Sequence, residues 1–323
     1  MTALMTSMHA LMVVLVLHGG LVYAQAYPAR PIRIVIPYPP GGGTDIVIRA
    51  VGPRLSERLG QSVVIDNRGG ATGTIGSEAV AHAAADGYTL LAHTNAGITI
   101  LPHLNKSLPY DPIRDFAPVT LAASSPYLLV VHPKLAATSV AQFIALAKAR
   151  PGELNYASSG NGASTHLAGL LFCQMAGVKM VHIPYKGSGP ATTDLLGGQV
   201  QSRFSSIPPV LQHVRAGRLR ALGVTSAKRF SLLPDVPTIA ATLPGFEVDS
   251  WYGVFAPAGT PAAIIGKLNS AFAAALSAPD VKALLATDGS EVVASSPERF
   301  GAIIRAEFAR WGPVVRESGA KID

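Results

Sequence analysis

The chain has 323 residues, which is too long for one small hydrophobic core and suits two lobes of ordinary domain size. Hydrophobic residues make up 49% of it and charged residues 14%, which excludes an intrinsically disordered protein and fits a well-packed globule. The formal net charge is +7, yet basic residues neither form a run nor alternate with aromatic residues, so nucleic acid is not expected as a partner. A diffuse positive charge instead suits the capture of small anions.

The amino terminus carries the pattern of an export signal. Residues 10–24 are largely apolar, and small residues follow before Tyr27. The apolar run is shorter than the roughly 20 residues that span a bilayer, which argues against an uncleaved anchor. The first residues contain no Lys or Arg, so either the start is misassigned or the free amino group supplies the charge. We predict a signal peptide over residues 1–26 and a mature chain outside the cytoplasm.

From residue 32 the chain alternates β-rich runs with amphipathic helical stretches. Apolar residues recur at every fourth position from Val47 to Leu59, which predicts a helix over residues 44–59. A second helix is expected to end near Ala85, and strands are predicted at residues 32–36, 63–66 and 88–92. This β–α–β–α–β order implies parallel strands covered by helices.

A second set of alternating elements follows. Its first helix is expected to begin at Ser139, because Gln142 stands at the spacing of a capping box, and to end at the turn of residues 151–152. Strands are predicted at residues 128–131, 154–157, 181–183, 200–204 and 218–225, and further helices at 165–175, 191–196 and 210–216.

The remainder of the chain is expected to mix proline-marked loops with helices at residues 262–276, 279–286 and 297–318. The last of these helices has Ser296 as its cap, Pro297 at the first position and Glu298 in the first turn. We interpret the two sets as two lobes. Lobe 2 is expected over residues 124–226, and lobe 1 over residues 27–123 together with 227–323.

Several predicted strands run into loops of Gly, Ser, Thr and Pro, and open α/β sheets bind ligands beyond the carboxyl ends of their strands. The loop at 39–45 opens a helix whose N-terminus favours an anion. The loop at 158–165 repeats this arrangement and adds hydroxyl donors, and loops at 94–97 and 186–189 are further examples. Each loop alone is equally well explained as a tight turn, whereas two that face each other across a cleft favour a binding site.

Patterns of several other kinds of site are missing from the sequence. It has no GxxxxGK[ST] or GxGxxG phosphate loop, no G-x-S-x-G nucleophile turn and no HxxxH or HExxH metal pair. The single cysteine, Cys173, excludes an internal disulfide and a zinc site of paired cysteines, and its apolar neighbours favour a small core residue. No cofactor, metal site or catalytic residue is therefore expected.

Three polar residues have two interpretations each. His166 follows Ser164 and Thr165, so a Ser–His catalytic pair is possible, but a histidine one turn into a helix is expected to pack or cap. Asp45 and Asp194 fall at helix starts or within helices. A cap or a surface charge is the favoured interpretation there, over a functional role.

Aromatic and basic residues near the loops are similarly ambiguous. Tyr185 and the pair Trp251–Tyr252 could wall a cleft or pack in the core, and the polar atom of each suits either role. Arg203 lies in a strand, residues 200–204, that otherwise has the pattern of a buried one. If it points into the cleft it would clamp a carboxylate, but we favour a solvated position at the edge of the sheet.

Short motifs of one family recur in order over nearly the whole mature chain. They are Tyr27-Pro28, Pro31-Ile32-Arg33-Ile34-Val35, Pro37-Tyr38-Pro39-Pro40-Gly41-Gly42, Ala85-Asp86-Gly87-Tyr88-Thr89-Leu90-Leu91, Ser159-Gly160-Asn161-Gly162 with His166-Leu167-Ala168-Gly169, Ile183-Pro184-Tyr185-Lys186-Gly187, Asp194-Leu195-Leu196-Gly197-Gly198-Gln199-Val200, Leu233-Pro234-Asp235-Val236-Pro237-Thr238 and Trp251-Tyr252-Gly253. Each motif is weak alone, but the ordered series is specific. In these residues the chain resembles the periplasmic solute receptors of tripartite tricarboxylate transporters, often called Bug-type receptors.

The resemblance implies an α/β, two-lobed periplasmic-binding-protein (Venus-flytrap) fold, in which each lobe is a mostly parallel sheet flanked by helices and the ligand cleft lies between the lobes. It implies a monomeric periplasmic receptor, without catalysis, that passes a small carboxylate to membrane transporter subunits. The family's ligand-binding positions correspond in this sequence to Tyr38, Gly41, Gly42, Gly43, Thr44, Thr94, Asn95, Ser159, Gly160, Gly162, Ser164, Thr165, Tyr185, Lys186, Ser205 and Ser206.

Two features depart from the family pattern. Ser205 and Ser206 stand where many members have an acidic or amide residue, and Arg203 stands where many have an apolar one. These departures leave open whether the distal end of the ligand is a second anionic group or a neutral tail. Two alternative functions also stay open: a sensor that presents the ligand to a membrane signalling protein, and a periplasmic enzyme that uses His166 or Cys173.

Overall fold

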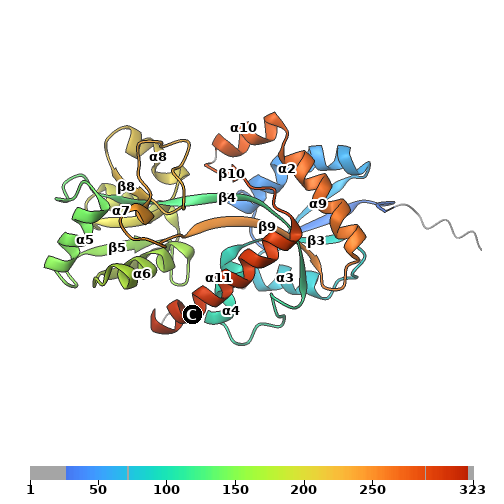
Figure 1. Ribbon diagram of the computed structural model, residues 1–323, viewed down its shortest axis with the longest axis horizontal. Helices are drawn as coiled ribbons and strands as arrows, with labels where there is room; N and C mark the ends of the chain where they lie inside the picture. Colours follow the sequence, from blue (N-terminus) through green and yellow to red (C-terminus); the bar gives the residue numbers. More distant parts are fainter. Residues whose placement is uncertain (1–26, 71–72, 288, 319–323) are drawn as a thin grey trace, which may run out of the picture.

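The computed structural model describes residues 27–70, 73–287 and 289–318, which form two lobes side by side (Figure 1). The predicted signal peptide, residues 1–26, lies outside the described residues. Within these ranges, no helix combines the length and the apolar character needed to cross a membrane.

Lobe 1 begins with the predicted β–α–β–α–β unit. Strands β2 (Val63–Asn67), β1 (Ile32–Ile36) and β3 (Thr89–Thr94) lie in that order and pair in parallel, which confirms the prediction. Alternate residues of β1 point to opposite faces. Ile34 therefore packs with Val47 of helix α2 (Gly43–Leu59), whereas Val35 packs with Val80 of helix α3 (Thr74–Ala81) on the other face.

Two long antiparallel strands join the lobes. Strand β4 (Phe116–Val131) pairs with strand β9 (Asp249–Pro257) from the Phe116–Pro257 pair to the Pro126–Asp249 pair. Beyond Pro126, β4 continues into lobe 2 and pairs there with strands β7 (Ser202–Ser206) and β8 (Arg220–Val224). Figure 1 shows both strands crossing the gap between the lobes. With β5 (Asn155–Ser158) and β6 (Val181–Pro184), the sheet order is β2-β1-β3-β9-β4-β7-β5-β6, so one series of paired strands runs through both lobes.

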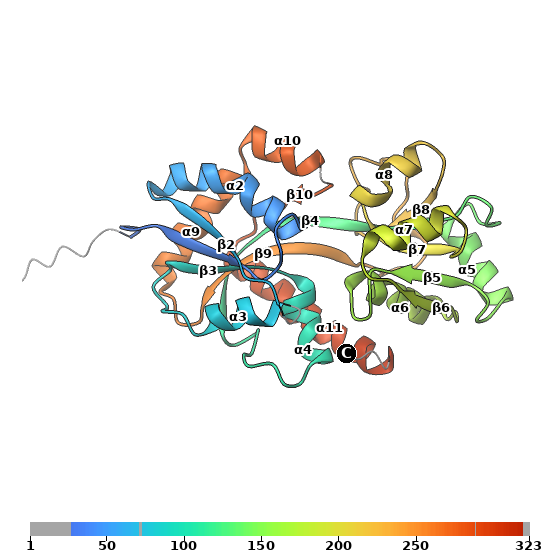
Figure 2. The same cartoon turned by 180° about the vertical axis from the view of Figure 1, so that it is seen from behind.

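Lobe 2 repeats the architecture of lobe 1. Strands β6 (Val181–Pro184), β5 (Asn155–Ser158) and β7 (Ser202–Ser206) are parallel, and β8 (Arg220–Val224) is antiparallel to β4. Figure 2 shows α7 (Ser188–Leu196) and α8 (Pro208–Arg215) above this sheet and α6 (Ser164–Ala176) below it. Phe204 contacts Phe172 of α6. Helix α5 (Val140–Ala149) has Ser139 as its N-cap, as predicted, with the Ser139 side chain accepting from the Gln142 amide.

The last third of the chain returns to lobe 1. Helix α9 (Ala262–Leu276) packs against α2, helix α10 (Pro279–Thr287) follows, and strand β10 (Glu291–Val292) pairs with β4. Helix α11 (Pro297–Ser318) crosses from one lobe to the other. Its first half places Phe300 in a lobe 1 core, and its second half places Trp311 in the lobe 2 core.

The segment between β8 and β9, which includes the helical turn η3 (Ile239–Ala241), packs on lobe 2. Phe230, Ile239 and Phe246 are buried in the two lobe 2 cores. This packing differs from the division expected at residue 226. We propose that lobe 2 extends from Tyr127, where β4 changes partners, to Val248, the last residue before β9.

The sequence did not predict the strands β9 and β10, the start of β4 at Phe116 rather than residue 128, or the short helices η2 (Ala96–Ile100), α4 (Leu101–Leu104) and η3. Pro118, Pro126 and the serines between them are not typical of a strand, because proline cannot donate to a ladder. The long strand forms nevertheless, and its register shifts after Pro118.

Thr225 and Asp249 lie where β4 and β9 pass from one lobe to the other. Thr225 Oγ1 accepts from the Tyr127 amide at 2.8 Å, and its one proton faces the Tyr127 carbonyl at 3.2 Å and Asp249 Oδ1 at 3.5 Å. The Asp249 carbonyl accepts from Asn95 Nδ2 at 2.8 Å. Burial raises the pKa of Asp249 to about 7, and the nearby carboxylates of Glu247 and Glu307 act in the same direction. The region where the strands pass between the lobes is therefore polar, and the carboxyl group of Asp249 within it is costly to ionise.

Replacing this carboxyl should stabilise the protein at alkaline pH. A pKa raised in the folded state means that stability is lost as pH rises from the unfolded value near 4 to about 7. We expect Asp249→Asn to raise the free energy of unfolding at pH 8 by about 1–3 kcal/mol, and by much less at pH 5. Urea unfolding at the two pH values measures this, with the exposed Asp235→Asn as control. An equal effect at both pH values would contradict the assignment.

Candidate functional site

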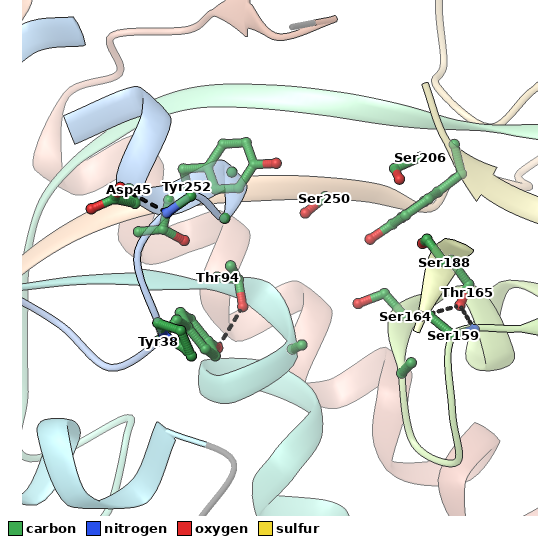
Figure 3. A pocket seen from close by; sticks show the side chains of 18 of the residues that line it. Tyr38, Asp45, Thr94, Ser159, Ser164, Thr165, Ser188, Ser206, Ser250 and Tyr252 are labelled. Carbon is green, nitrogen blue, oxygen red and sulfur yellow. Dashed lines mark hydrogen bonds between the residues drawn. The ribbon is translucent and has the colours of Figure 1, made fainter. Parts of the chain in front are cut away.

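A cleft of about 580 Å³ lies between the lobes (Figure 3). Its lining is made mainly of hydroxyls, glycines and aromatic rings, and among the described residues Asp45 is its one carboxylic acid and it includes no Lys or Arg. Lobe 1 and the crossing strands contribute Tyr38, Pro39, Pro40, Gly41, Gly42, Gly43, Thr44, Asp45, Thr94, Ala96, Tyr127, Ser250 and Tyr252, and lobe 2 contributes Ser159, Ala163, Ser164, Thr165, Ser188 and Ser206. A smaller hollow of about 230 Å³, lined partly by Leu101 and Leu104, shares four of these residues.

Asp45 fixes the loop that follows β1. Its Oδ2 accepts from the Gly41 amide at 2.9 Å and from Arg49 Nε at 2.8 Å, and its Oδ1 accepts from Asn67 Nδ2 at 3.1 Å. Burial by itself raises the pKa of this carboxyl, but the hydrogen bonds and the Arg49 charge outweigh burial and hold the pKa below its usual value. Asp45 is thus a buried loop anchor whose charge is already balanced by Arg49.

Gly43 allows the ring of Tyr252 to lie against the start of α2. A Cβ atom at position 43 would sit 2.2 Å from the Tyr252 hydroxyl oxygen, which no real side chain tolerates. At the neighbouring Gly42, the nearest atom to an added Cβ is the Pro39 carbonyl oxygen, at 3.9 Å. The close approach is therefore specific to Gly43, and it brings β9 and the α2 N-terminus into one wall of the cleft.

Tyr38 and Thr94 are held together at the base of the lobe 1 wall. The Tyr38 hydroxyl lies 3.0 Å from both Thr94 Oγ1 and His93 Nδ1, and the Thr94 amide donates to that same nitrogen at 2.8 Å. Burial lowers the pKa of His93 to about 3, so its ring is neutral and Nδ1 accepts. The two hydroxyls are therefore positioned before any ligand arrives.

The lobe 2 wall is a loop that rests on two stacked imidazoles. The Ser159 amide donates to Thr165 Oγ1 at 3.0 Å, and the Gly162 amide donates to His166 Nδ1 at 3.1 Å. Ser158 Oγ lies 2.7 Å from His182 Nε2, and the rings of His166 and His182 stack with centroids 3.7 Å apart. Burial lowers the pKa of both histidines to about 4, and for His166 the neighbouring His182 adds to the effect.

Three helices begin at the cleft without a side-chain cap. The N-cap residues of α2, α6 and α7 are Gly42, Ala163 and Gly187, and none makes a capping hydrogen bond through its side chain. Residues of the first turn of each helix line the cleft: Thr44, Ser164 and Ser188. A helix N-terminus carries about half a positive charge and unsatisfied N–H groups, so the cleft favours an anion from both lobes.

The structure brings most of the predicted site residues together. Tyr38, Gly41, Gly42, Gly43, Thr44, Thr94, Ser159, Ser164, Thr165 and Ser206 line the cleft, and Gly160 and Gly162 line the smaller hollow. Four others lie outside both linings. Asn95 bonds the Asp249 carbonyl, the Tyr185 hydroxyl donates to Asp194 at 2.7 Å, Lys186 is exposed, and Ser205 is buried.

Sequence reasoning missed some residues of the lining. Tyr127 and Ser250 escaped because β4 and β9 were not predicted to cross there, and Ser188 was seen only as part of a glycine loop. Tyr252 lines the cleft, whereas its neighbour Trp251 is buried in a core and donates to Glu307. The alternation of side chains along a strand explains this split.

The expected solvated position of Arg203 is wrong. Its side chain is fully buried, because the register of β7 turns it toward α7 while Phe204 faces α6. The other residues weighed for chemistry are structural in their contacts. His166 stacks under the loop, and Cys173 is partly buried against the lobe 2 core, where burial raises its pKa to about 11. Among the described residues, no group of three or more His, Cys, Asp and Glu is placed to hold a metal.

Comparison with known proteins agrees with this fold and cleft. The family described as "Tripartite tricarboxylate transporter family receptor" matches residues 47–320, and the chain belongs to this family of solute receptors. Protein BugT of Bordetella pertussis is 43% identical over 307 residues, which cover 93% of each chain.

Two solved structures from Rhodopseudomonas palustris are similar over most of the chain. Rpa4515 with adipate is 40% identical, with a TM-score of 0.76, over 91% of this chain and 99% of that one. MatC with bound malate is 34% identical, with a TM-score of 0.73, over 90% of this chain and 100% of that one. Both similarities extend across both lobes, so the two-lobed receptor fold is the fold of this chain.

The contact between Gly43 and Tyr252 predicts a difference between adjacent glycines. We expect Gly43→Ala to lower the free energy of unfolding by about 1–3 kcal/mol, because the added methyl forces the tyrosine ring out of the wall. The same change at Gly42 should stay within about 0.5 kcal/mol, since its Cβ meets ordinary contacts. Urea unfolding of both variants measures the difference. Equal stabilities would show that the ring moves at no cost.

The stacked histidines predict a pH dependence of stability. Their pKa values are about 4 in the folded protein and near 6.5 when unfolded, so the unfolded chain takes up protons first as pH falls. Stability should therefore decline from pH 6.5 to pH 4. We expect His182→Gln to flatten this decline by up to about 1.4 kcal/mol per pH unit, the value for one proton. The exposed His82→Gln is the control, and an unchanged slope in His182→Gln would refute the burial argument.

Proposed function

We propose that this protein is a periplasmic receptor that encloses a small carboxylate between its lobes and delivers it to the membrane subunits of a tripartite transporter. The observation that carries this proposal is the set of three uncapped helix N-termini, α2 from lobe 1 and α6 and α7 from lobe 2, that meet at one cleft. We further propose export through the signal peptide at residues 1–26 and a monomeric state.

The lining chemistry supports an anion that is bound through hydrogen bonds. Hydroxyls of Thr44, Thr94, Ser164 and Ser188 surround the cleft, and serine and threonine can each donate one proton to a carboxylate. The acid in the lining, Asp45, is occupied by Gly41, Arg49 and Asn67, so it does not compete with the ligand for these donors. The adipate and malate held by two relatives support a carboxylate as the ligand class.

Binding without catalysis is the better supported activity. The Ser158 side chain is fully buried and already bonds the backbone of Gly160, so the Ser158–His182 pair is not presented to the cleft. His166 Nδ1 is engaged by the Gly162 amide. Cys173 does not line the cleft, and burial keeps its pKa high, which disfavours the thiolate. The family and the structural relatives are binding proteins as well.

The proposal can be tested by identifying what the purified protein carries. Small molecules released on denaturation are analysed by mass spectrometry, and mono-, di- and tricarboxylates are screened for a rise in melting temperature. We expect a released or added carboxylate to raise the melting temperature by several degrees. Absence of any shift across the three classes would contradict the proposal.

A bulky side chain at the start of α6 should abolish binding without unfolding the protein. Ser164 is the first residue of that helix and lines the cleft, so Ser164→Leu occupies the space of the ligand. We expect the carboxylate-induced rise in melting temperature to disappear. This corresponds to a loss of affinity of about 100-fold or more, or roughly 3 kcal/mol of binding free energy. Ser270→Leu on the exposed side of α9 is the matched control. A retained shift in Ser164→Leu would remove this serine from the site.

A further inference from the structure

Arg203 of β7 carries a buried positive charge that no acidic side chain among the described residues neutralises. One terminal nitrogen, Nη1, donates to the Ser188 carbonyl at 2.7 Å and to the Thr192 hydroxyl, and Nη2 donates to Ser188 Oγ at 2.8 Å. Its Nε has no hydrogen-bond partner in the described part of the chain. None of the ion pairs between described residues includes Arg203. Buried charges in proteins are normally paired, so this one calls for an anion.

The place of the guanidinium makes the imbalance larger. Ser188 is the first residue of α7, and the helix begins at Gly187 without a side-chain cap. A helix N-terminus is itself positive and favours negative groups, so a cation bonded to its first residue is unfavourable on its own. Arginine and helix end together form a concentrated positive site with no protein counter-charge among the described residues.

Ser188 connects this positive site to the cleft. Its side chain lines the cleft, whereas Arg203 is covered and does not. Because Ser188 Oγ accepts a hydrogen bond from Arg203, its own proton remains available to another acceptor. A charged donor also polarises the hydroxyl and strengthens the bond that it donates. Figure 3 shows Ser188 on the lobe 2 side, across the cleft from Asp45 and Tyr252 on the lobe 1 side.

We propose that Ser188 at the α7 N-terminus is a subsite for a second anionic group, and that Arg203 is the positioning residue that charges it, so that the receptor prefers dianions to monoanions. This inference rests on the proposed function as a carboxylate receptor. One carboxylate lies at the α2 N-terminus in lobe 1, and the second accepts from Ser188 in lobe 2. A ligand with two anionic ends then holds both lobes, and it supplies the negative charge that Arg203 lacks within the protein.

The test compares acids of equal length that differ in the second carboxylate. Isothermal titration calorimetry measures the affinities of adipate against hexanoate and of succinate against butanoate, for the wild type and for Arg203→Gln, Arg203→Lys and Ser188→Ala. We expect the wild type to favour the diacid. The ratio of diacid to monoacid affinity should fall about tenfold or more in Arg203→Gln and Ser188→Ala, the size expected for a charge-assisted hydrogen bond. Ser270→Ala, on the exposed side of α9 and outside the lining of the cleft, should keep the ratio.

A merely structural role of Arg203 would weaken both acids of a pair by the same factor, and that result would overturn the inference. A lower ratio in Arg203→Gln with an unchanged ratio in Ser188→Ala would overturn the route through Ser188. If Arg203→Gln does not fold, Ser188→Ala decides the matter, since its side chain lies at the surface of the cleft. A wild type that binds both acids equally overturns this inference and leaves the proposed function standing, whereas a wild type that binds no carboxylate overturns the proposed function.

Discussion

The pairing of β4 with β9 is the constraint on which the rest of the structure depends. From the Phe116–Pro257 pair to the Pro126–Asp249 pair the two strands stay paired, with register shifts after Pro118 and Leu121, and β4 then continues as a strand of lobe 2. Both lobes contain parts of the same two strands. The carboxyl ends of the parallel strands of each lobe therefore face the cleft between the lobes. The loops after β1, β3, β5 and β6 and the end of β7 therefore meet there, and with them the starts of α2, α6 and α7.

The cleft gains its positive character from helix ends and not from side chains in its lining. Asp45 is paired with Arg49, so the lobe 1 wall is neutral apart from the start of α2. Lobe 2 adds the starts of α6 and α7, and behind α7 lies the unpaired charge of Arg203. Fixed dipoles and a buried cation hold their direction without the loss of side-chain freedom that a surface lysine would suffer on binding. Such a site can be charged and still present hydroxyls and backbone to the ligand.

Helices and strands were predicted well where the sequence signal lies within the segment itself. The helices at 44–59 and 262–276 and the strands at 32–36 and 63–66 follow from apolar periodicity and from glycine or proline at their ends, and all were found. Strand β9 and the first half of β4 were missed because Pro118, Pro126 and Ser250 break the apolar pattern, while their pairing comes from residues over 100 positions apart. The predicted solvated position of Arg203 was wrong for a related reason, because a sequence cannot tell which face of β7 a helix will cover.

The sequence by itself determined the periodicities, the glycine and serine loops at strand ends, and the ordered motifs that identify the family. It also determined which residues could become donors, since a hydroxyl or an uncapped helix start is a property of a short segment. The tertiary structure decided which donors share one space: it placed Tyr127 and Ser250 in the cleft, removed Asn95, Tyr185, Lys186 and Ser205 from its lining, and buried Arg203 behind Ser188. The reason is physical. Hydrogen-bonding capacity and periodicity are local, whereas burial and facing depend on the register of strands that meet only after the chain has folded.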